Sequence, residues 1–194
     1  MIKNLTRAVL FTLVLVVLTG LVYPLVMTGI AQVAFHGKAN GSVISVDGHE
    51  VGSALVGQQW KGPQWFYGRP SVIDYDASTS QGSNLGPLSK ALATDIEQRA
   101  KAIKAIEGAY HPGLTTSQIP VDLLTASASG LDPQISPSAA GFQAPRIAAT
   151  RGIPLSEVNR LIDENTSQPT LGFMGEPRVN VLELNLALQQ LAQK

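Results

Sequence analysis

The chain has 194 residues, no cysteine, and fourteen Lys and Arg against fourteen Asp and Glu. The lack of cysteine excludes a lipoprotein-type anchor, a disulfide framework and thiol chemistry. The balanced charge, with no basic stripe, argues against nucleic acid as a partner.

Residues 8–35 carry no charged side chain and are the most informative segment of the chain. A helix rises about 1.5 Å per residue, and a bilayer core needs roughly 20 apolar residues to cross. The segment therefore predicts one tilted transmembrane helix over 8–35. It follows a short cytoplasmic N-terminus, residues 1–7, and precedes one water-facing domain, residues 36–194.

The charges that flank this segment predict its orientation. Lys3 and Arg7 precede it, whereas Lys38 is the only basic residue among the next twenty. Basic flanks stay in the cytoplasm, so the large domain is expected outside. The alternative is a cleaved signal peptide. A retained span is favoured because the run is about twice the usual apolar length and 32–34 makes a poor cleavage site.

Three residues of the predicted span, Gly20, Pro24 and Gly29, indicate packing against partner helices. Pro24 removes a backbone donor and is expected to kink the helix near Gly20. Glycine lets a neighbouring helix approach closely. The competing interpretation is that Gly and Pro are simply common in membrane helices.

The outer domain begins with a predicted β-hairpin over 41–57, because Asp47-Gly48 separates two apolar runs. A loop with four aromatic residues follows, namely Trp60, Trp65, Phe66 and Tyr67. Clustered aromatic side chains can form a binding surface, but they more often seal a small core. The core interpretation is favoured here.

The first helix of the domain is expected to follow a polar loop over 69–87. Pro87 suits a first helical turn, and Gly108 with Pro112 ends the pattern. Apolar residues recur on one face at helical spacing: Leu88, Leu92, Ile96, Ile103 and Ile106.

The next segment combines short apolar pieces with prolines. Residues 121–125 predict a short strand or a buried turn. The dipeptides Asp132-Pro133 and Ser136-Pro137 each resemble a helix cap followed by a first-turn proline. Pro145 is expected to break or kink any helix that begins at Pro137.

Two further helices complete the domain. Residues 155–165 form one, with Val158, Leu161 and Ile162 facing inward. The last begins at Asn180, which with Glu183 resembles a capping box. Its apolar stripe consists of Val181, Leu184, Leu188 and Leu191. The predicted fold is therefore α+β: one N-terminal transmembrane helix and a compact, helix-rich extracytoplasmic domain with a small sheet.

The turn at 127–132 is the clearest candidate for ligand contact. Small residues, Ser127, Ser129 and Gly130, run toward an expected helix start and can present backbone N–H groups to an anion. However, Asp132 would repel phosphate, and Ser and Asp at a turn more often act as caps. The residues alone favour capping.

Other chemistry finds little support in the sequence. The three histidines, His36, His49 and His111, lack metal-ligand spacing, and 74–76 lacks the pattern of a calcium loop. There is no P-loop and no G-x-S-x-G elbow. A membrane-anchored periplasmic hydrolase that uses Asp76, Ser83 or Asp132 remains an alternative hypothesis.

Taken together, several segments resemble the C subunit of the bacterial Kdp potassium-transporting P-type ATPase. They are the N-terminal span, VGSALVGQQW, YGRPS, SQGSNLGPLS, VDLLTASASGLDPQISPSAA, PRIAATRG and GEPRVNVLELNLAL. The resemblance covers nearly the whole chain. It is more specific than any single segment, because the segments occur together and in order.

The resemblance implies a heteromeric pump in the bacterial inner membrane. Its expected partners are a channel-like A subunit, an ATP-hydrolysing B subunit and any small accessory subunit, all within the lipid bilayer. This chain has neither a DKTGT phosphorylation motif nor a TVGYG-like filter. It is therefore expected to be accessory and non-catalytic, with no cofactor of its own. The family implies a catalytic chaperone that raises the ATP affinity of the B subunit.

The resemblance also implies a nucleotide contact at Ser127, Ser129, Gly130 and Asp132. This conflicts with the charge bias, which places these residues outside the cell. We therefore expect the outer domain to dock over the external face of the A subunit and to stabilise the complex. A potassium-loading role is the alternative, with cations attracted by four acidic residues: Asp74, Asp76, Asp122 and Asp132.

Overall fold

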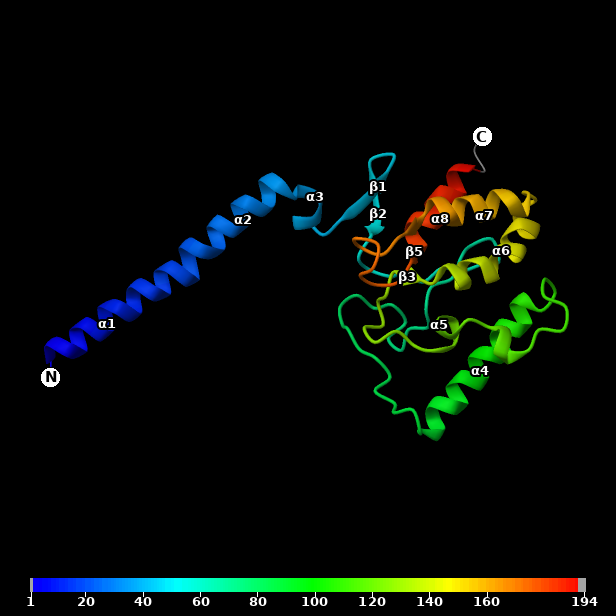
Figure 1. Cartoon of the computed structure of the whole chain (residues 1–194), viewed down its shortest axis with the longest axis horizontal. Coiled ribbons are helices and arrows are strands. Elements are labelled where there is room, and N and C mark those ends of the chain that lie inside the picture. Colours follow the sequence, from blue (N-terminus) through cyan, green and yellow to red (C-terminus); the bar gives the residue numbers. More distant parts are fainter. Residues whose placement is uncertain (1, 192–194) are drawn as a thin grey trace. The chain divides into compact units, whose positions relative to one another are not determined.

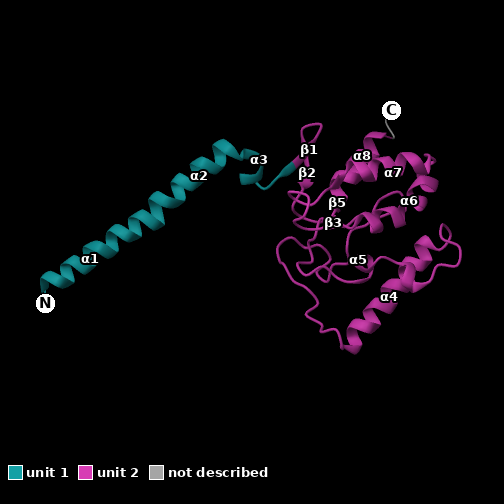
Figure 2. Cartoon of the chain, viewed as in Figure 1, with its two compact units in different colours: residues 1–43 teal, residues 44–194 magenta. Residues whose placement is uncertain are grey.

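The computed structural model describes residues 2–191 of the chain. The chain divides into two compact units, residues 1–43 and residues 44–194 (Figure 2).

Unit 1 is dominated by one long apolar helix over Ile2–Ala34, which contains an 18-residue stretch with a mean hydropathy of 2.6. It consists of α1 (Ile2–Val17), a π-helical turn (Leu18–Val22) and α2 (Tyr23–Ala34), and a single helical turn, α3 (His36–Ala39), follows. The helix is long and apolar enough to cross a membrane, as the sequence predicts.

The π-helical turn lies where the sequence predicts a kink. The N–H of Tyr23 donates to the carbonyl of Leu18, five residues earlier. The turn ends two residues before Pro24, whose ring provides no N–H for the carbonyl of Gly20. The irregularity caused by Pro24 therefore takes the form of a widened helical turn that contains Gly20.

Unit 2 begins in the predicted hairpin. Strands β1 (Val43–Val46) and β2 (His49–Ser53) pair and are joined by two residues. Asp47 and Gly48 both have positive φ, 51° and 80°, as a type I′ turn requires. The Asp-Gly signal in the sequence is thus confirmed.

The core of unit 2 lies between helices and a small antiparallel sheet (Figure 1). The sheet has the order β3-β5-β4, and Val179 at its centre pairs with both Ile135 and Thr166. Helix α7 contacts both α6 and α8. The elements are β3 (Gln134–Ile135), α6 (Pro137–Arg151), α7 (Leu155–Glu164), β4 (Thr166–Ser167), β5 (Arg178–Asn180) and α8 (Val181–Leu191).

The helices with strong apolar periodicity are found where the sequence predicts them. The expected inward residues of α7, Val158, Leu161 and Ile162, are buried, and so are three of the four in α8: Val181, Leu184 and Leu188. Asn180 Oδ1 accepts the N–H groups of residues 182 and 183 and thereby caps α8. Together with the small sheet, these helices confirm the α+β prediction.

Of the two prolines predicted to start helices, Pro137 does so and Pro133 does not. Ser136 caps α6 by accepting the N–H of Ala139 at 3.0 Å, and Pro137 occupies its first turn as expected. The helix continues through Pro145 to Arg151 without a break. Asp132-Pro133 was expected to start a helix, but this prediction is wrong because Pro133 leads into β3.

The expected start of the first domain helix is also wrong. Helix α4 covers Lys90–Glu107, with Ser89 as its cap residue. The N–H of Ser89 donates to the carbonyl of Gly86, so a turn precedes the helix and leaves Leu88 97% exposed. Leu88 therefore does not belong to the apolar face.

Short helices fill the connection that follows α4. A single 3₁₀ turn covers Thr116–Gln118. Residues 121–125, predicted as a strand or a buried turn, form one helical turn, α5 (Val121–Leu124). Leu123 and Leu124 are buried, so the buried turn is closer to the structure than the strand.

Candidate functional site

The structure brings the four predicted ligand residues, Ser127, Ser129, Gly130 and Asp132, into one turn. Within it, the N–H of Gly130 donates to Ser127 Oγ at 2.9 Å, and the N–H of Leu131 donates to Ser129 Oγ at 3.1 Å. Asp132 Oδ1 accepts the N–H two residues later. These N–H groups are therefore bound by the turn's own side chains, and the nucleotide contact stays a prediction.

The same turn holds other loops together. The carbonyl of Ser129 accepts the N–H of Gln81 at 2.9 Å. The carbonyl of Leu131 accepts the N–H of Gly57 at 2.7 Å. Gly130 has φ +71°, and a Cβ at this position would lie 2.6 Å from the Ile73 side chain and 2.9 Å from the carbonyl of Gln81. The turn is thus a structural junction that tolerates only glycine at 130.

Substituting Gly130→Ala is expected to destabilise unit 2 by about 2–4 kcal/mol, from backbone strain and overpacking together. Gly113→Ala is the matched control, since Gly113 also has positive φ (75°) but open space around its Cβ position. It is expected to cost about 1 kcal/mol. Urea unfolding of the full chain in detergent measures both values. Equal costs would contradict the predicted clash.

Asp132 also connects the turn to a surface cleft. It forms an ion pair with Arg69 at 3.1 Å, and both side chains are partly exposed. Burial and the nearby negative charge of Asp132 raise the pKa of Tyr75 to about 12, so this phenol stays protonated and donates to the carbonyl of Arg69. The cleft has a volume of about 460 Å³, and its charged residues are Arg69, Asp122, Asp132, Glu176 and Arg178.

The acidic residues considered as cation attractors lie in different places. Asp122 and Asp132 line the same cleft, where Asp122 accepts the N–H of Ser136 at 2.8 Å. Asp74 and Asp76 are exposed. Hydrogen bonds from Ser78 lower the pKa of Asp76. The cleft therefore combines two of the four acids with two arginines and is not a purely acidic funnel.

The three residues of the hydrolase hypothesis are not brought together. Asp76 accepts the N–H of Ser78, and Ser83 Oγ accepts the N–H of Leu85. Among residues 2–191, no hydrogen bond joins Asp76, Ser83 or Asp132 to another of the three.

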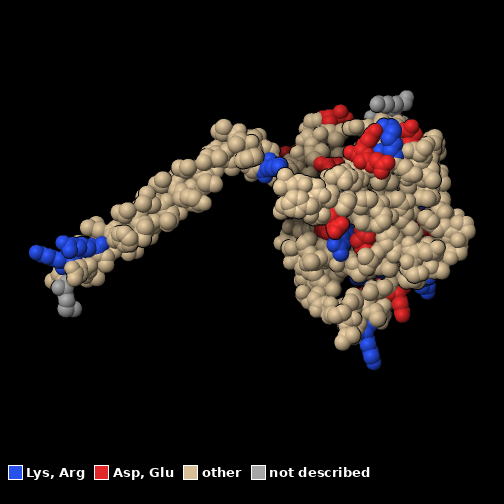
Figure 3. Space-filling model, in the orientation of Figure 1, with Lys and Arg blue, Asp and Glu red and all other residues tan. Residues whose placement is uncertain are grey.

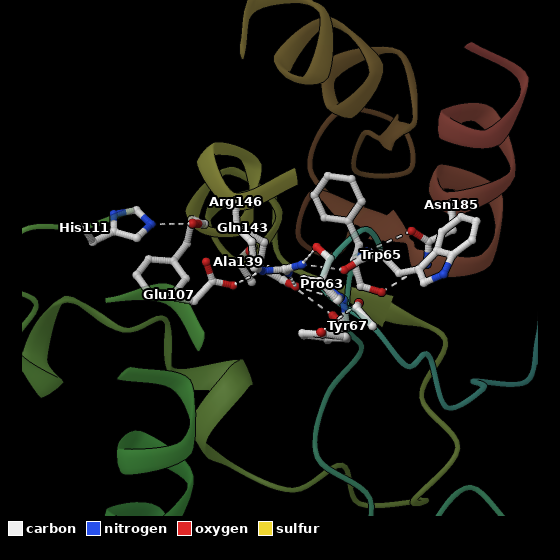
Figure 4. A network of polar contacts seen from close by, with 12 residues as sticks. Pro63, Trp65, Tyr67, Glu107, His111, Ala139, Gln143, Arg146 and Asn185 are labelled. Atoms are coloured by element: carbon white, nitrogen blue, oxygen red, sulfur yellow. Dashed lines mark hydrogen bonds and ion pairs between the residues drawn. The ribbon is translucent and has the colours of Figure 1, made fainter. Parts of the chain in front are cut away.

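A buried polar network surrounds Arg146, a residue for which no role was predicted from the sequence (Figure 4). Its side chain is fully buried, and Nε donates to Glu107 Oε1 at 2.7 Å. Its other nitrogens donate to Gln143 Oε1 and to the carbonyl groups of Pro63 and Trp65. One guanidinium thus connects α4, α6 and the aromatic loop.

Glu107 is the second charged residue of this network and only 3% exposed. Burial raises the pKa of its carboxyl, and Arg146 opposes this effect. Its second oxygen, Oε2, has no hydrogen-bond partner among residues 2–191. The residue lines a cavity of about 80 Å³ together with Tyr67, Ile103, Leu123 and other residues.

Two buried amide side chains hold the aromatic loop from opposite sides. Asn185 on α8 accepts the N–H of Phe66 at 2.9 Å and donates to its carbonyl at 3.0 Å. Gln143 on α6 makes the same pair of bonds with Tyr67, at 2.8 and 3.1 Å. Each amide replaces the neighbouring strand that an extended segment would have in a sheet. Phe66 is fully buried, which confirms the core interpretation for this loop residue.

The sequence contained a weak signal for this network. Gln143 and Arg146 are three residues apart on α6 among alanines, and Asn185 directly follows Leu184 on the apolar side of α8. Polar residues at positions expected to be buried require partners. The partners lie as much as 119 residues away, so they could not be identified from spacing.

The predicted packing residues of the span lie in unit 1. The span helix has no buried residue, and a Cβ added at Gly20 or Gly29 would meet no atom within 4 Å. Pro24 lies in the first turn of α2. Their contact with partner helices stays a prediction.

Comparison with known proteins gives a consistent result over nearly the whole length of the chain. Residues 5–190 match the family described as KdpC, the K⁺-transporting ATPase c chain. Three relatives are named potassium-transporting ATPase KdpC subunit. The relative from Herpetosiphon aurantiacus is 52% identical over 90% of each chain. That from Polaromonas naphthalenivorans is 50% identical over 97% of this chain and 96% of its own. The relative from Caldanaerobacter subterraneus is 46% identical over 99% of this chain and 97% of its own.

Proposed function

This chain belongs to the KdpC family of K⁺-transporting ATPase c chains, and from that premise we propose that it is an accessory subunit that anchors a docking domain on the extracytoplasmic side of the pump. The observation that carries the proposal is the family match, because it includes both the apolar helix and the domain. The proposed partners are the channel-like A subunit and the P-type B subunit in the inner membrane.

The proposed orientation rests on the flanking charges. Lys3 and Arg7 precede the apolar helix, and only Lys38 follows closely. A reporter protein fused after Lys194 tests this orientation. Activity of a reporter that works only outside the cytoplasm is expected. A reporter active only in the cytoplasm would overturn the orientation.

The proposed mechanism is stabilisation of the assembly from outside. The buried polar groups around Arg146 bind other parts of the same domain, which makes unit 2 a preorganised body for docking. An outside domain does not meet cytoplasmic ATP. Any rise in ATP affinity, the role implied by the family, is therefore proposed to pass through the conformation of the complex and not through contact at 127–132.

Purification of the pump tests the proposal. The full chain is expected to co-purify in detergent with the tagged A and B subunits, and its removal is expected to lower the yield of complex and raise the KM for ATP. Ser129→Ala is expected to leave that KM unchanged. A larger KM in this variant, with the complex intact, would favour direct nucleotide contact. An equally active pump without the chain would refute the accessory role.

A further inference from the structure

The loop between β4 and β5 exposes three large apolar side chains. Leu171 is 78% exposed, Phe173 77% and Met174 54%. We refer to these three residues as the apolar knob. Apolar side chains that gather at one place on a surface mark an interaction site, whereas single exposed ones need no explanation.

The loop that carries the apolar knob has a closed, hydrogen-bonded conformation. The N–H of Thr170 donates to the carbonyl of Met174, and the N–H of Met174 donates back, both at 2.9 Å. Leu171 has φ +56°, an uncommon conformation for a residue with a branched side chain. A preformed loop loses little conformational entropy on binding, so its apolar side chains suit a protein pocket.

The charges near the knob argue against a lipid surface as its occupant. Residues 161–177 contain three acidic residues and no Lys or Arg. The basic residues that line the same cleft as Glu176 are Arg178, which is half-buried, and Arg69, which is paired with Asp132. Peripheral attachment to bilayers relies on Lys and Arg beside the apolar groups, because anionic headgroups repel carboxylates. Glu176, two residues after Met174 in the same loop, instead favours a partner with a basic rim.

The position of the loop places it near the part of unit 2 that is tethered to the membrane span. Strand β5, which follows the loop, adjoins the end of the hairpin, since Asn180 Nδ2 donates to the carbonyl of Ala54 at 2.8 Å (Figure 1). The hairpin begins unit 2, and Ile44 lies ten positions after Ala34 in the chain. That length reaches at most roughly 33–36 Å when fully extended. Partners embedded in the membrane are thus within reach.

We propose that the apolar knob inserts into an apolar pocket with a basic rim on the extracytoplasmic surface of a membrane-embedded companion subunit of the same ATPase. The proposal rests on the proposed function, because it requires such companion subunits. The docking contact is thereby assigned to the apolar knob. On the face of unit 2 seen in the space-filling view, charged side chains are scattered without a continuous basic stripe (Figure 3).

A double substitution tests the knob. Leu171→Ser with Phe173→Ser is expected to lower the fraction of chain that co-purifies with tagged companion subunits at least tenfold. Leu88→Ser with Val121→Ser is the matched control, because these side chains are 97% and 70% exposed elsewhere on unit 2. The control is expected to co-purify like the wild type. Equal urea midpoints of the two variants exclude unfolding as the cause.

A fluorescent probe distinguishes a protein partner from lipid. The chain has no cysteine, so Met174→Cys can be labelled singly with a polarity-sensitive fluorophore before assembly. A blue shift that needs the companion subunits supports the proposal. A blue shift in lipid nanodiscs that hold this chain alone would overturn it in favour of lipid. If wild-type chain co-purifies but the knob variant does so equally, the docking site is wrong and the proposed function stands. If wild-type chain does not co-purify, the proposed function itself fails.

Discussion

Replacing Arg146 with methionine is expected to destabilise unit 2 by about 3–5 kcal/mol at neutral pH. Methionine fills much of the same space but donates no hydrogen bond. The substitution leaves Glu107 buried without its cation, and it leaves the carbonyl groups of Pro63 and Trp65 without this donor. Urea unfolding followed by the fluorescence of Trp60 and Trp65 measures the loss, since both indoles lie in the aromatic loop.

The cost of the Arg146→Met substitution is expected to shrink as the pH falls. Burial raises the pKa of Glu107 in the folded protein, and without Arg146 nothing in this pair opposes that rise. When a carboxyl has a higher pKa in the folded state than in the unfolded state, binding a proton there stabilises the folded protein. That contribution is complete below the unfolded pKa and is lost as the pH rises through the folded pKa. The gap between variant and wild type should therefore be smaller at pH 5 than at pH 8.

The two partners of the buried ion pair are not expected to be equivalent. Glu107→Gln should cost less than Arg146→Met, because burial already disfavours the carboxylate and Arg146 keeps its carbonyl and Gln143 acceptors. Arg160→Met is the control: its ion pairs with Glu157 and Glu164 are exposed, and the loss should be small. A cost of Arg146→Met that does not change with pH would refute the role given to Glu107.

Local signals in the sequence predicted local structure well. The Asp47-Gly48 turn, the cap at Ser136 and the apolar faces of α7 and α8 each depend on neighbours a few residues apart. Such patterns are visible without the fold. The start of α4 was misplaced because Pro87 is equally suited to a turn before a helix, and only the bond from Ser89 to Gly86 decides between them.

The polar junctions could not be predicted, since they join distant segments. The turn at 127–132 reads as a helix cap or an anion cradle when its own residues are considered. Its carbonyl groups in fact bind residues 57 and 81. In the same way, Glu107 ends α4 and looks like a solvated charge, but its partner lies 39 residues further along the chain. Spacing carries no information on such pairs.

The second large effect is expected at Asn185. Asn185→Leu keeps the branched shape of the side chain but removes the amide that binds both backbone groups of Phe66. A buried polar group left without a partner costs about 1–3 kcal/mol, so the N–H and the carbonyl of Phe66 together predict a loss of about 2–6 kcal/mol. The control is Gln189→Leu, an exposed position one helical turn later, which should change stability by less than about 0.5 kcal/mol.

The Asn185 substitution also tests why the aromatic loop lies between two helices. If the paired amides hold it there, the tryptophan emission of Asn185→Leu should shift to the red at urea concentrations below the main transition, because Trp60 and Trp65 then gain water. Gln189→Leu should show one transition, as the wild type does. A loss below 1 kcal/mol with unchanged emission would mean that apolar packing around Phe66, and not the amide pair, positions the loop.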